Sequence, residues 1–192
     1  MELKGSRTAE NLMKAFAGES QARNRYTYAA SIARKEGYEH IAAIFEETAL
    51  NEKEHAKLFF KHLATLAPGS VEIQAAYPVV TGDTAAQLAA AVAGENEEWT
   101  KLYPEFARIA REEGFDAVAK TFEWISKVEK EHEKRYMRLL KRVTDHTVFV
   151  RDGKIYWRCR NCGHIHEGPK PPTACPVCMH PQAFYEPVGE DF

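Results

Sequence analysis

The sequence predicts a mainly α protein, in which a four-helix bundle with a long crossover between helices 2 and 3 precedes a small C-terminal domain of short β-strands built around four cysteines. Three observations lead to this fold class. Residues 8–145 are rich in helix formers, with apolar positions recurring every three or four residues. The motif Glu-x-x-His occurs at corresponding places in two halves of that region. All four cysteines lie between positions 159 and 178, where proline, glycine and aromatic residues replace the helix formers.

Length and composition limit the functions to consider. A chain of 192 residues can hold one domain of ordinary size and one small domain, which we place at 1–146 and 147–192. The net charge is -2 and the basic residues are dispersed, which argues against a nucleic-acid or anionic-membrane partner. No apolar run approaches the roughly 18 residues of a membrane span, and the N-terminus lacks the apolar core of a signal peptide. We therefore expect a cytoplasmic protein.

The helical region divides into four segments, each with an apolar stripe of the kind that faces a bundle core. The stripes occupy residues 12–33, 41–62, 88–106 and 118–139. Glu-Gly-aromatic turns at 36–38 and 113–115 separate the first two segments and the last two. Gaps this short predict two antiparallel helix hairpins.

The connection between the hairpins, residues 67–83, contains two prolines, two glycines and a β-branched stretch. Fully extended it would reach roughly 55 Å, whereas a helix of about 28 residues is roughly 42 Å long. The connection can therefore run the length of the bundle and make helices 2 and 3 parallel. Thr84 and Gln87 then predict a capping-box start for helix 3.

The two halves form an imperfect internal repeat. The Ala-Gly-Glu motif ends at Glu19 and again at Glu95, an offset of 76 residues, whereas Glu-x-x-His recurs at an offset of 77. Tyr26 lies seven residues after Glu19, but Tyr103 lies eight after Glu95. The second half therefore carries one extra residue between positions 95 and 103.

We predict that a one-residue π-bulge between Glu95 and Pro104 accommodates this extra residue. An eight-residue step would rotate Tyr103 by roughly 80° from the seven-residue position in a regular helix, and a bulge restores the register. Pro104, which cannot donate an amide hydrogen bond, is compatible with such a break. The same bulge would re-aim Glu98.

Carboxylate and imidazole side chains interrupt the apolar stripes. One copy of Glu-x-x-His arises readily by chance, but two copies in register within a repeat favour a metal site. Two Glu helices and two Glu-x-x-His helices are the ligand pattern of a carboxylate-bridged two-metal centre in a bundle, and this donor set suits iron or manganese. The candidate ligands are Glu19, Glu52, His55, Glu95, Glu98, Glu129 and His132.

The C-terminal region predicts a second metal site. Cys159-x-x-Cys162 and Cys175-x-x-Cys178 have the spacing of two metal knuckles that form one tetrahedral four-thiolate site. This pattern alone suits a structural zinc ribbon at least as well as iron, but the neighbouring redox-capable bundle favours iron. Residues 148–150 and 155–157 predict a hairpin around Asp152-Gly153.

The motifs together resemble the rubrerythrin family over essentially the whole chain. The resemblance is carried by LKGSRT, FAGESQARNRY, both Glu-x-x-His motifs, YPEFARIAREEGF, and WRCRNCG through CPVC. It implies a ferritin-like bundle followed by a rubredoxin-like domain. It also implies two non-haem irons, with Glu52 and Glu129 as bridges, Glu19 and His55 on one iron, and Glu95 and His132 on the other. Glu98 resembles the ligand that replaces His55 when that iron shifts, and the four cysteines match a single-iron centre.

The resemblance further implies a peroxidase that reduces hydrogen peroxide to water in oxidative-stress defence. Electrons would pass through the four-cysteine iron from rubredoxin or from an NAD(P)H-dependent donor protein. The chain would form a homodimer, and the sequence does not decide whether the two subunits exchange helices. No Gly-rich dinucleotide motif is present. Glu98, Tyr26 and Tyr103 are candidate catalytic residues, although the tyrosines are equally well explained as core aromatics.

Two rival functions follow from the same parts. A ferroxidase or iron store would use the bundle but would not need residues 147–192. A pure electron carrier would need the four cysteines but not two Glu-x-x-His motifs. We expect the remaining histidines to be solvated or to serve local packing: His40, His62, His146, His164, His166 and His180.

Overall fold

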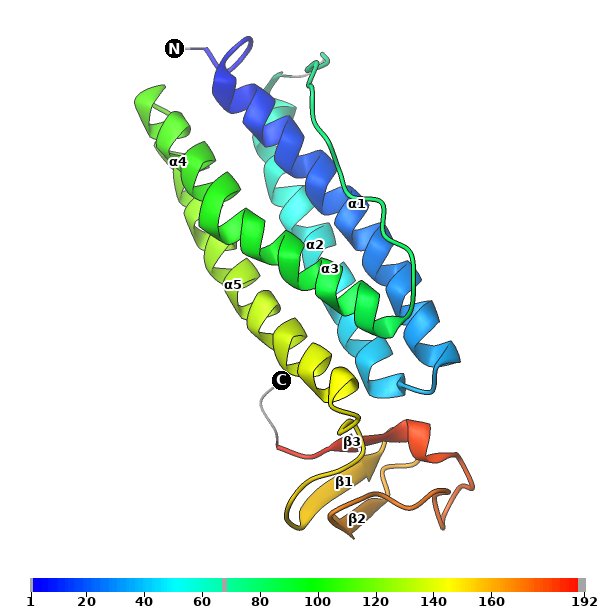
Figure 1. Cartoon of the computed structure of the whole chain (residues 1–192). Helices are drawn as coiled ribbons and strands as arrows, with labels where there is room; N and C mark the ends of the chain where they lie inside the picture. The colour runs from blue at the N-terminus through cyan, green and yellow to red at the C-terminus, as the bar shows by residue number, and fades with distance from the viewer. Residues whose placement is uncertain (1, 67–68, 190–192) are drawn as a thin grey trace.

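The computed structural model describes residues 2–66 and 69–189 and confirms the predicted fold class. Two antiparallel helix hairpins form the bundle, and a small sheet packs at one end of it (Figure 1). The first hairpin consists of α1 (Arg7–Lys35) and α2 (Glu39–Leu63), with a short 3-10 turn at Ala64–Leu66. The second consists of α3 (Thr84–Glu97), a π-helix at Glu98–Leu102 and α4 (Tyr103–Glu112), which form one continuous rod, followed by α5 (Asp116–Thr144).

Local sequence signals set the ends of the helices. Ser6 caps α1 by accepting a hydrogen bond from the Ala9 amide. The predicted turns are confirmed, because α1 ends before Gly37 and α4 ends before Gly114, with φ values of 83° and 82°. Glycine adopts this left-handed conformation without steric cost, so each helix stops where the chain must reverse.

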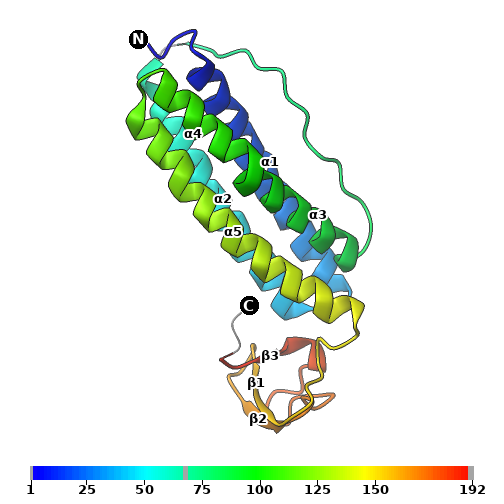
Figure 2. The same cartoon turned by 60° about the vertical axis from the view of Figure 1, so that its left-hand side comes forward.

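The crossover runs along the bundle from the end of α2 to the start of α3, so these two helices are parallel as predicted (Figures 1 and 2). Of the predicted connection 67–83, Ala67 and Pro68 lie outside the described residues. The remainder has no regular secondary structure before the turn that precedes α3. The Tyr77 hydroxyl donates to the Lys14 carbonyl at 2.8 Å and ties the crossover to α1.

The predicted cap of α3 is wrong by one residue. Asp83 is the N-cap, and its carboxylate accepts from the Ala86 amide at 2.9 Å. The Thr84 amide donates instead to Glu36 Oε2 at 3.0 Å. A carboxylate adds charge to the capping interaction at the helix N-terminus, and the Glu36 contact draws Thr84 into the first turn.

The predicted π-bulge is confirmed as a π-helix over Glu98–Leu102. The Glu133 carboxylate, on α5, holds this segment: one oxygen accepts from Asn96 Nδ2 at 2.9 Å and the other from Trp99 Nε1 at 2.6 Å. Ser126 Oγ donates to the Trp99 carbonyl at 3.2 Å. Side chains of α5 thus satisfy polar groups on and beside the π-helix.

Two apolar clusters fill the bundle. One contains Ile41, Phe45 and Tyr136, and the other contains Phe59 and Phe122. In every helix the candidate metal ligands fall in sequence between the segments that build the two clusters. A layer of buried carboxylates and imidazoles therefore separates two apolar halves of the core.

The small domain is a three-stranded antiparallel sheet in the order β2-β1-β3. Its strands are β1 (Ile155–Cys159), β2 (Ile165–Gly168) and β3 (Tyr185–Pro187), with a 3-10 turn at Gln182–Phe184. Residues 155–157 lie in a strand as predicted, but the predicted hairpin is wrong, because residues 148–150 form a turn and β1 pairs with β2 instead.

The physical reason is packing at the junction of the two parts. Val148 packs against the bundle core, and Phe149 stacks on Tyr38 with ring centroids 6.3 Å apart. His40 Nδ1 lies 3.0 Å from Glu186 Oε2. These contacts fix the small domain beside the start of α2 and the end of α5. Among the described residues, none of the helices has both the length and the apolar character needed to span a membrane.

Candidate metal centres

The structure brings six of the predicted ligands together in the polar layer of the bundle. Each of α1, α2, α3 and α5 contributes, and each of the six side chains is at most 8% exposed. The ligand atoms form two overlapping groups, within each of which all atoms lie within 4.8 Å of one another. The first group is Glu19, Glu52, His55 and Glu129, and the second is Glu52, Glu95, Glu129 and His132.

Glu52 and Glu129 belong to both groups and face both imidazoles. Nδ1 of His55 lies 2.8 Å from Glu52 Oε2 and 2.9 Å from Glu129 Oε1. Nδ1 of His132 lies 3.3 Å from Glu52 Oε1 and 2.8 Å from Glu129 Oε2. Each carboxylate therefore offers one oxygen to either side, which is the geometry of a bridging ligand.

Glu19 and Glu95 complete the two sides. Glu19 Oε2 lies 3.7 Å from Nδ1 of His55, and Glu95 Oε2 lies 3.7 Å from Nδ1 of His132. Each side therefore presents one imidazole nitrogen, one terminal carboxylate and two shared carboxylates. The two sides match because the Glu-x-x-His repeats place their side chains on equivalent helix faces.

The buried polar atoms of this layer fit a pair of metal ions. Within the described part of the chain, both oxygens of Glu52 and Glu129, Oε2 of Glu95 and Nδ1 of each histidine are buried, and the close approach of imidazole to carboxylate gives none of them an aligned hydrogen bond. Four buried carboxylates facing two imidazoles leave excess negative charge, which is costly, and cations between them would remove that cost. Carboxylate and imidazole donors suit iron or manganese, whereas structural zinc sites usually recruit thiolates.

The pKa values of the buried carboxylates also indicate that this layer would be stabilised by added positive charge. Burial, reinforced by the charges of Glu129 and Glu52, raises the pKa of Glu19 well above its usual range. Burial and the charge of Glu52 raise the pKa of Glu95 to about 8. Burial alone would raise the pKa of Glu52 too, but the two imidazoles lower it to about 2. The carboxylates thus compete for protons that metal ions would replace.

The tyrosines at positions 26 and 103 donate hydrogen bonds to candidate ligands of the opposite half. Tyr26, on α1, donates to Glu95 Oε1 at 2.5 Å, and Tyr103, on α4, donates to Glu19 Oε1. Both rings are buried. In metal centres such outer hydrogen bonds fix the orientation of a ligand carboxylate. Both interpretations of these tyrosines therefore apply, because each is a core aromatic residue and also a hydrogen-bond donor to a candidate ligand.

Glu98 lies outside both ligand groups but close to them. It begins the π-helix and lines a cavity together with Tyr103. Burial and the charges of Glu19 and Glu95 raise the pKa of Glu98 well above its usual range. In this conformation His55, and not Glu98, completes the first group.

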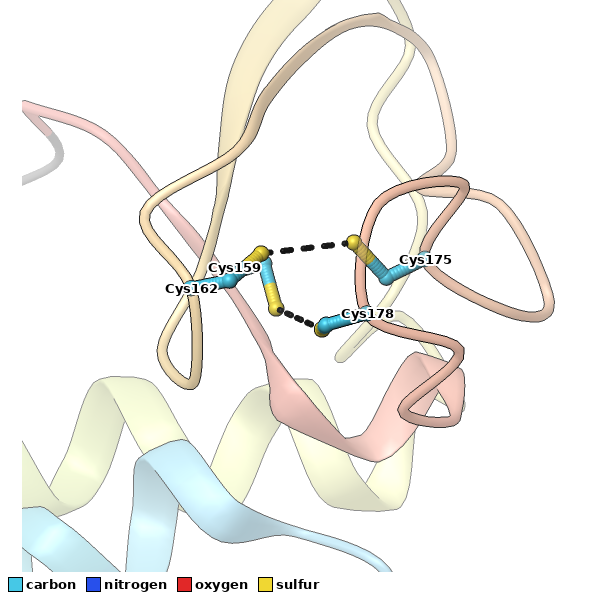
Figure 3. Close-up of side chains that lie close together, drawn as sticks. All are labelled: Cys159, Cys162, Cys175 and Cys178. Carbon is cyan, nitrogen blue, oxygen red and sulfur yellow. Dashed lines mark hydrogen bonds between the residues drawn. The ribbon is translucent and has the colours of Figure 1, made fainter.

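The four cysteines form a separate cluster in the small domain, where their sulfurs converge from two loops (Figure 3). Sγ of Cys159 lies 3.7 Å from Sγ of Cys178, and Sγ of Cys162 lies 3.6 Å from Sγ of Cys175. A metal bound tetrahedrally at about 2.3 Å separates its sulfurs by about 3.8 Å. The cluster therefore has the size of a four-thiolate metal site, for which zinc and iron are both suited.

Backbone geometry makes the two loops equivalent. The Cys159 carbonyl accepts from the Gly163 amide, and the Cys175 carbonyl accepts from the Met179 amide. Gly163 and Met179 both have positive φ, of 78° and 60°. This turn is characteristic of a metal knuckle, in which amides point at sulfur.

Amide and hydroxyl contacts stabilise negative charge on two of the four thiols, those of Cys175 and Cys178. Burial would raise the pKa of Cys175, but the Tyr185 hydroxyl and the amides of Cys178 and Val177 lower it to about 5. The His180 amide lowers the pKa of Cys178. Thiolate is the form that binds metal, so both shifts favour a loaded site.

Sequence reasoning missed two contributors to the surroundings of the centre. Glu133 follows His132 directly and holds the π-helix through Trp99, but a glutamate in a charged helix carries no signal of such a role. Tyr77 covers α1, and its only sequence signal is an aromatic residue within a crossover of mostly small and polar residues. Among the remaining histidines, His40 is buried and bound to Glu186, and His62 Nε2 lies 2.9 Å from Thr121 Oγ1.

Comparisons with known proteins agree with this geometry. The rubrerythrin family profile matches residues 10–140, and the profile of the rubrerythrin rubredoxin-like domain matches residues 157–186. Rubrerythrin-1 of Clostridium acetobutylicum is 56% identical over 99% of this chain and 98% of its own length. Rubrerythrin of Nitratidesulfovibrio vulgaris is 50% identical over 97% of each chain.

Solved structures show the same relationship. The fully reduced, all-ferrous state of nigerythrin superposes with a TM-score of 0.65 at 32% identity, covering 96% of this chain and 91% of that chain. A Desulfovibrio desulfuricans bacterioferritin superposes with a TM-score of 0.66 at 21% identity, over 73% of this chain and 82% of that chain, which shows the shared fold of the bundle. With the profiles and relatives covering both parts of the chain, the protein belongs to the rubrerythrin family.

Proposed function

We propose that this protein reduces hydrogen peroxide to water at a pair of iron ions in the bundle, with electrons supplied through a single iron in the four-cysteine site. The observation that carries the proposal is one chain with two overlapping carboxylate–imidazole groups and a separate four-thiolate cluster. Membership of a family of iron-binding oxidoreductases supports it.

Glu52 and Glu129 would hold an iron pair between them, and when bound it would supply the two electrons that, with two protons from solvent, convert one peroxide into two waters. The ligand residues come from four helices, so the bundle would fix the separation of the two sides of the site. Burial of the ligand layer excludes bulk water and strengthens every electrostatic interaction there. Because Glu52 and Glu129 belong to both ligand groups, they would keep the two metal positions close enough to act on one small substrate.

The tyrosines keep the terminal carboxylates in place throughout. The Tyr103 hydroxyl holds its proton, because burial and the nearby Glu19 raise its pKa, and it donates that hydrogen bond to Glu19 Oε1. Tyr26 does the same for Glu95. With Oε1 held by a tyrosine, Oε2 of each of these two carboxylates keeps a fixed direction toward the neighbouring imidazole and the proposed metal position.

We further propose a homodimer in which the four-cysteine site of one subunit serves the bundle centre of the other. Within one chain, α5 continues from His132 to Thr144 before the small domain begins, which is roughly 18 Å of helix. That separation favours delivery from a partner subunit. An external rubredoxin or NAD(P)H-dependent protein would reload the four-cysteine site.

Anaerobic stopped-flow mixing tests the reaction. Reduced protein is mixed with hydrogen peroxide or with oxygen at equal concentration, and oxidation of the bundle irons is followed by absorbance. We expect much faster oxidation by peroxide, with consumption of one peroxide per two electrons. Faster reaction with oxygen, accompanied by iron accumulation, would instead establish a ferroxidase or iron store.

The relay is tested separately with Cys162→Ser. We expect this variant to keep the bundle metals and the single-turnover reaction with peroxide, but to lose turnover supported by an external reductase. Metal analysis of the native protein should find about three irons per chain, two in the bundle and one at the thiolates. Full turnover by Cys162→Ser, or by protein with zinc at the cysteines, would refute the relay.

A further inference from the structure

A cavity of about 350 Å³ lies between α1, the crossover and the π-helix. This volume is within the size range of small-molecule sites. Its lining is mostly apolar, and its polar side chains include Gln21, Arg25 and Glu98. Arg25 Nε donates to Gln21 Oε1 at 2.6 Å, so a fixed cationic group lies on this wall.

The inner wall of the cavity reaches the bundle centre. Glu98 and Tyr103 both line it, and the Tyr103 hydroxyl donates to the candidate ligand Glu19. Gly18, the residue before Glu19, lies on the same wall. Four other cavities among the described residues have linings that contain neither a candidate bundle ligand nor either tyrosine bonded to one.

Residues 74–78 of the crossover form the outer part of the lining of this cavity. Tyr77 is the side chain that anchors this segment, because its hydroxyl donates to the Lys14 carbonyl at 2.8 Å. A Cβ placed on Gly18 would lie 3.7 Å from the Tyr77 ring, so glycine at this position leaves the ring in close contact with α1. The ring narrows the space directly beside the residue that precedes Glu19.

We infer that this cavity is the entrance by which a hydroperoxide reaches the bundle centre, and that Tyr77 is a specificity-determining residue that limits the size of the substrate. The inference rests on the proposed peroxidase function. The buried ligand layer needs a path from solvent, and this cavity ends at two residues that adjoin the layer. Hydrogen peroxide passes the Tyr77 ring, whereas a hydroperoxide with a bulky organic group meets it.

The entrance is tested by filling it. Ala76→Trp adds bulk to the crossover where it lines the cavity. Val79→Trp adds the same bulk to the same segment at a side chain that is 93% exposed and outside the lining. Azide binding to the oxidised, metal-loaded protein is followed by stopped-flow absorbance. We expect Ala76→Trp to slow azide association by about tenfold and Val79→Trp to leave it unchanged. Equal rates in both variants would overturn the entrance.

The role of Tyr77 is tested by opening the entrance. Tyr77→Ala removes the ring, and Tyr77→Phe removes only the hydroxyl anchor. We expect Tyr77→Ala to raise kcat/KM for cumene hydroperoxide relative to hydrogen peroxide by about tenfold or more, with Tyr77→Phe showing a smaller change. An unchanged ratio in Tyr77→Ala would overturn the specificity role. Circular dichroism and metal content establish that each variant is folded and loaded.

A wrong peroxidase function and a wrong entrance give different experimental results. If the wild-type protein reacts no faster with peroxide than with oxygen, the proposed function is wrong, but the azide comparison still tests the entrance. If peroxide is preferred and Ala76→Trp behaves like Val79→Trp, the function stands and the entrance is wrong.

Discussion

At the scale of single residues, the centre is built from hydrogen bonds that cross between the two halves of the repeat. Tyr26 of the first half holds Glu95 of the second, and Tyr103 of the second holds Glu19 of the first. Neither half therefore orders its own terminal carboxylate. This exchange explains why the extra residue before Tyr103 must be accommodated locally: the ring has to return to a position facing the opposite helix.

Removing one of these hydroxyls should destabilise the metal-free protein. Tyr103→Phe leaves Glu19 Oε1 buried without its donor, which costs about 1–3 kcal/mol. We expect a lower urea midpoint with an unchanged slope. The matched control is Tyr28→Phe, since Tyr28 lies on the surface of α1 and is 65% exposed. Equal stability of the two variants would show that the Tyr103 hydroxyl contributes nothing to the fold.

The proposed role of Glu98 as an exchangeable metal ligand can be tested by removing its charge. Glu98→Gln keeps the size of the side chain but removes its charge, so it should retain both bundle metals and lower peroxide turnover by about 10–100-fold. Glu105→Gln is the control, because the Glu105 side chain lies on the same helical rod, is 49% exposed and is outside the lining of the proposed entrance. Turnover and metal content are measured together. Loss of metal in Glu98→Gln would point to a permanent ligand and not an exchangeable one.

At the scale of elements, the π-helix is held from outside by α5. Glu133 accepts from Asn96 and Trp99 with both carboxylate oxygens. Trp99→Phe removes one hydrogen bond to a charged group, worth about 1.5–3 kcal/mol. We expect amide hydrogen exchange across residues 98–102 to become faster by about tenfold or more. Trp124→Phe, at a site 65% exposed on α5, should leave that exchange unchanged.

The elements also show which features the sequence can predict. The extra residue between Glu95 and Tyr103 located the π-helix, because repeat offsets report helical phase directly. The predicted start of α3 and the predicted strand at 148–150 are both wrong, because the structure at these positions depends on contacts distant in sequence. Glu36 accepts a hydrogen bond from the Thr84 amide, and Val148 packs against the core of the bundle. The local sequence pattern reports the helical phase and the spacing of the ligands. It does not report which distant part of the chain will contact a given residue.

At the scale of the whole molecule, one carboxylate links the small domain to the bundle. Glu186, on β3, contacts His40 of α2 and accepts hydrogen bonds from Arg158 of β1 and from Arg160 in the turn that follows β1. The side chain is buried. Together with the packing of Val148 and Phe149 on the bundle, this cluster joins the two parts of the chain, so its ionisation should contribute to how firmly they are held together.

Burial would raise the pKa of Glu186, but His40 and the two arginines outweigh it and lower the pKa to about 2. A carboxyl group whose pKa is lower in the folded state than in the unfolded state stabilises the fold at pH values above its unfolded-state pKa, which is about 4.3. That stabilisation, of order 3 kcal/mol, is lost as the pH falls from about 4.3 toward 2. We expect urea unfolding of the metal-free protein to show this loss, and Glu186→Gln to flatten it. Glu167→Gln, on exposed β2, should keep the wild-type pH dependence. A Glu186→Gln profile parallel to wild type across this window would show that the junction does not depend on this charge.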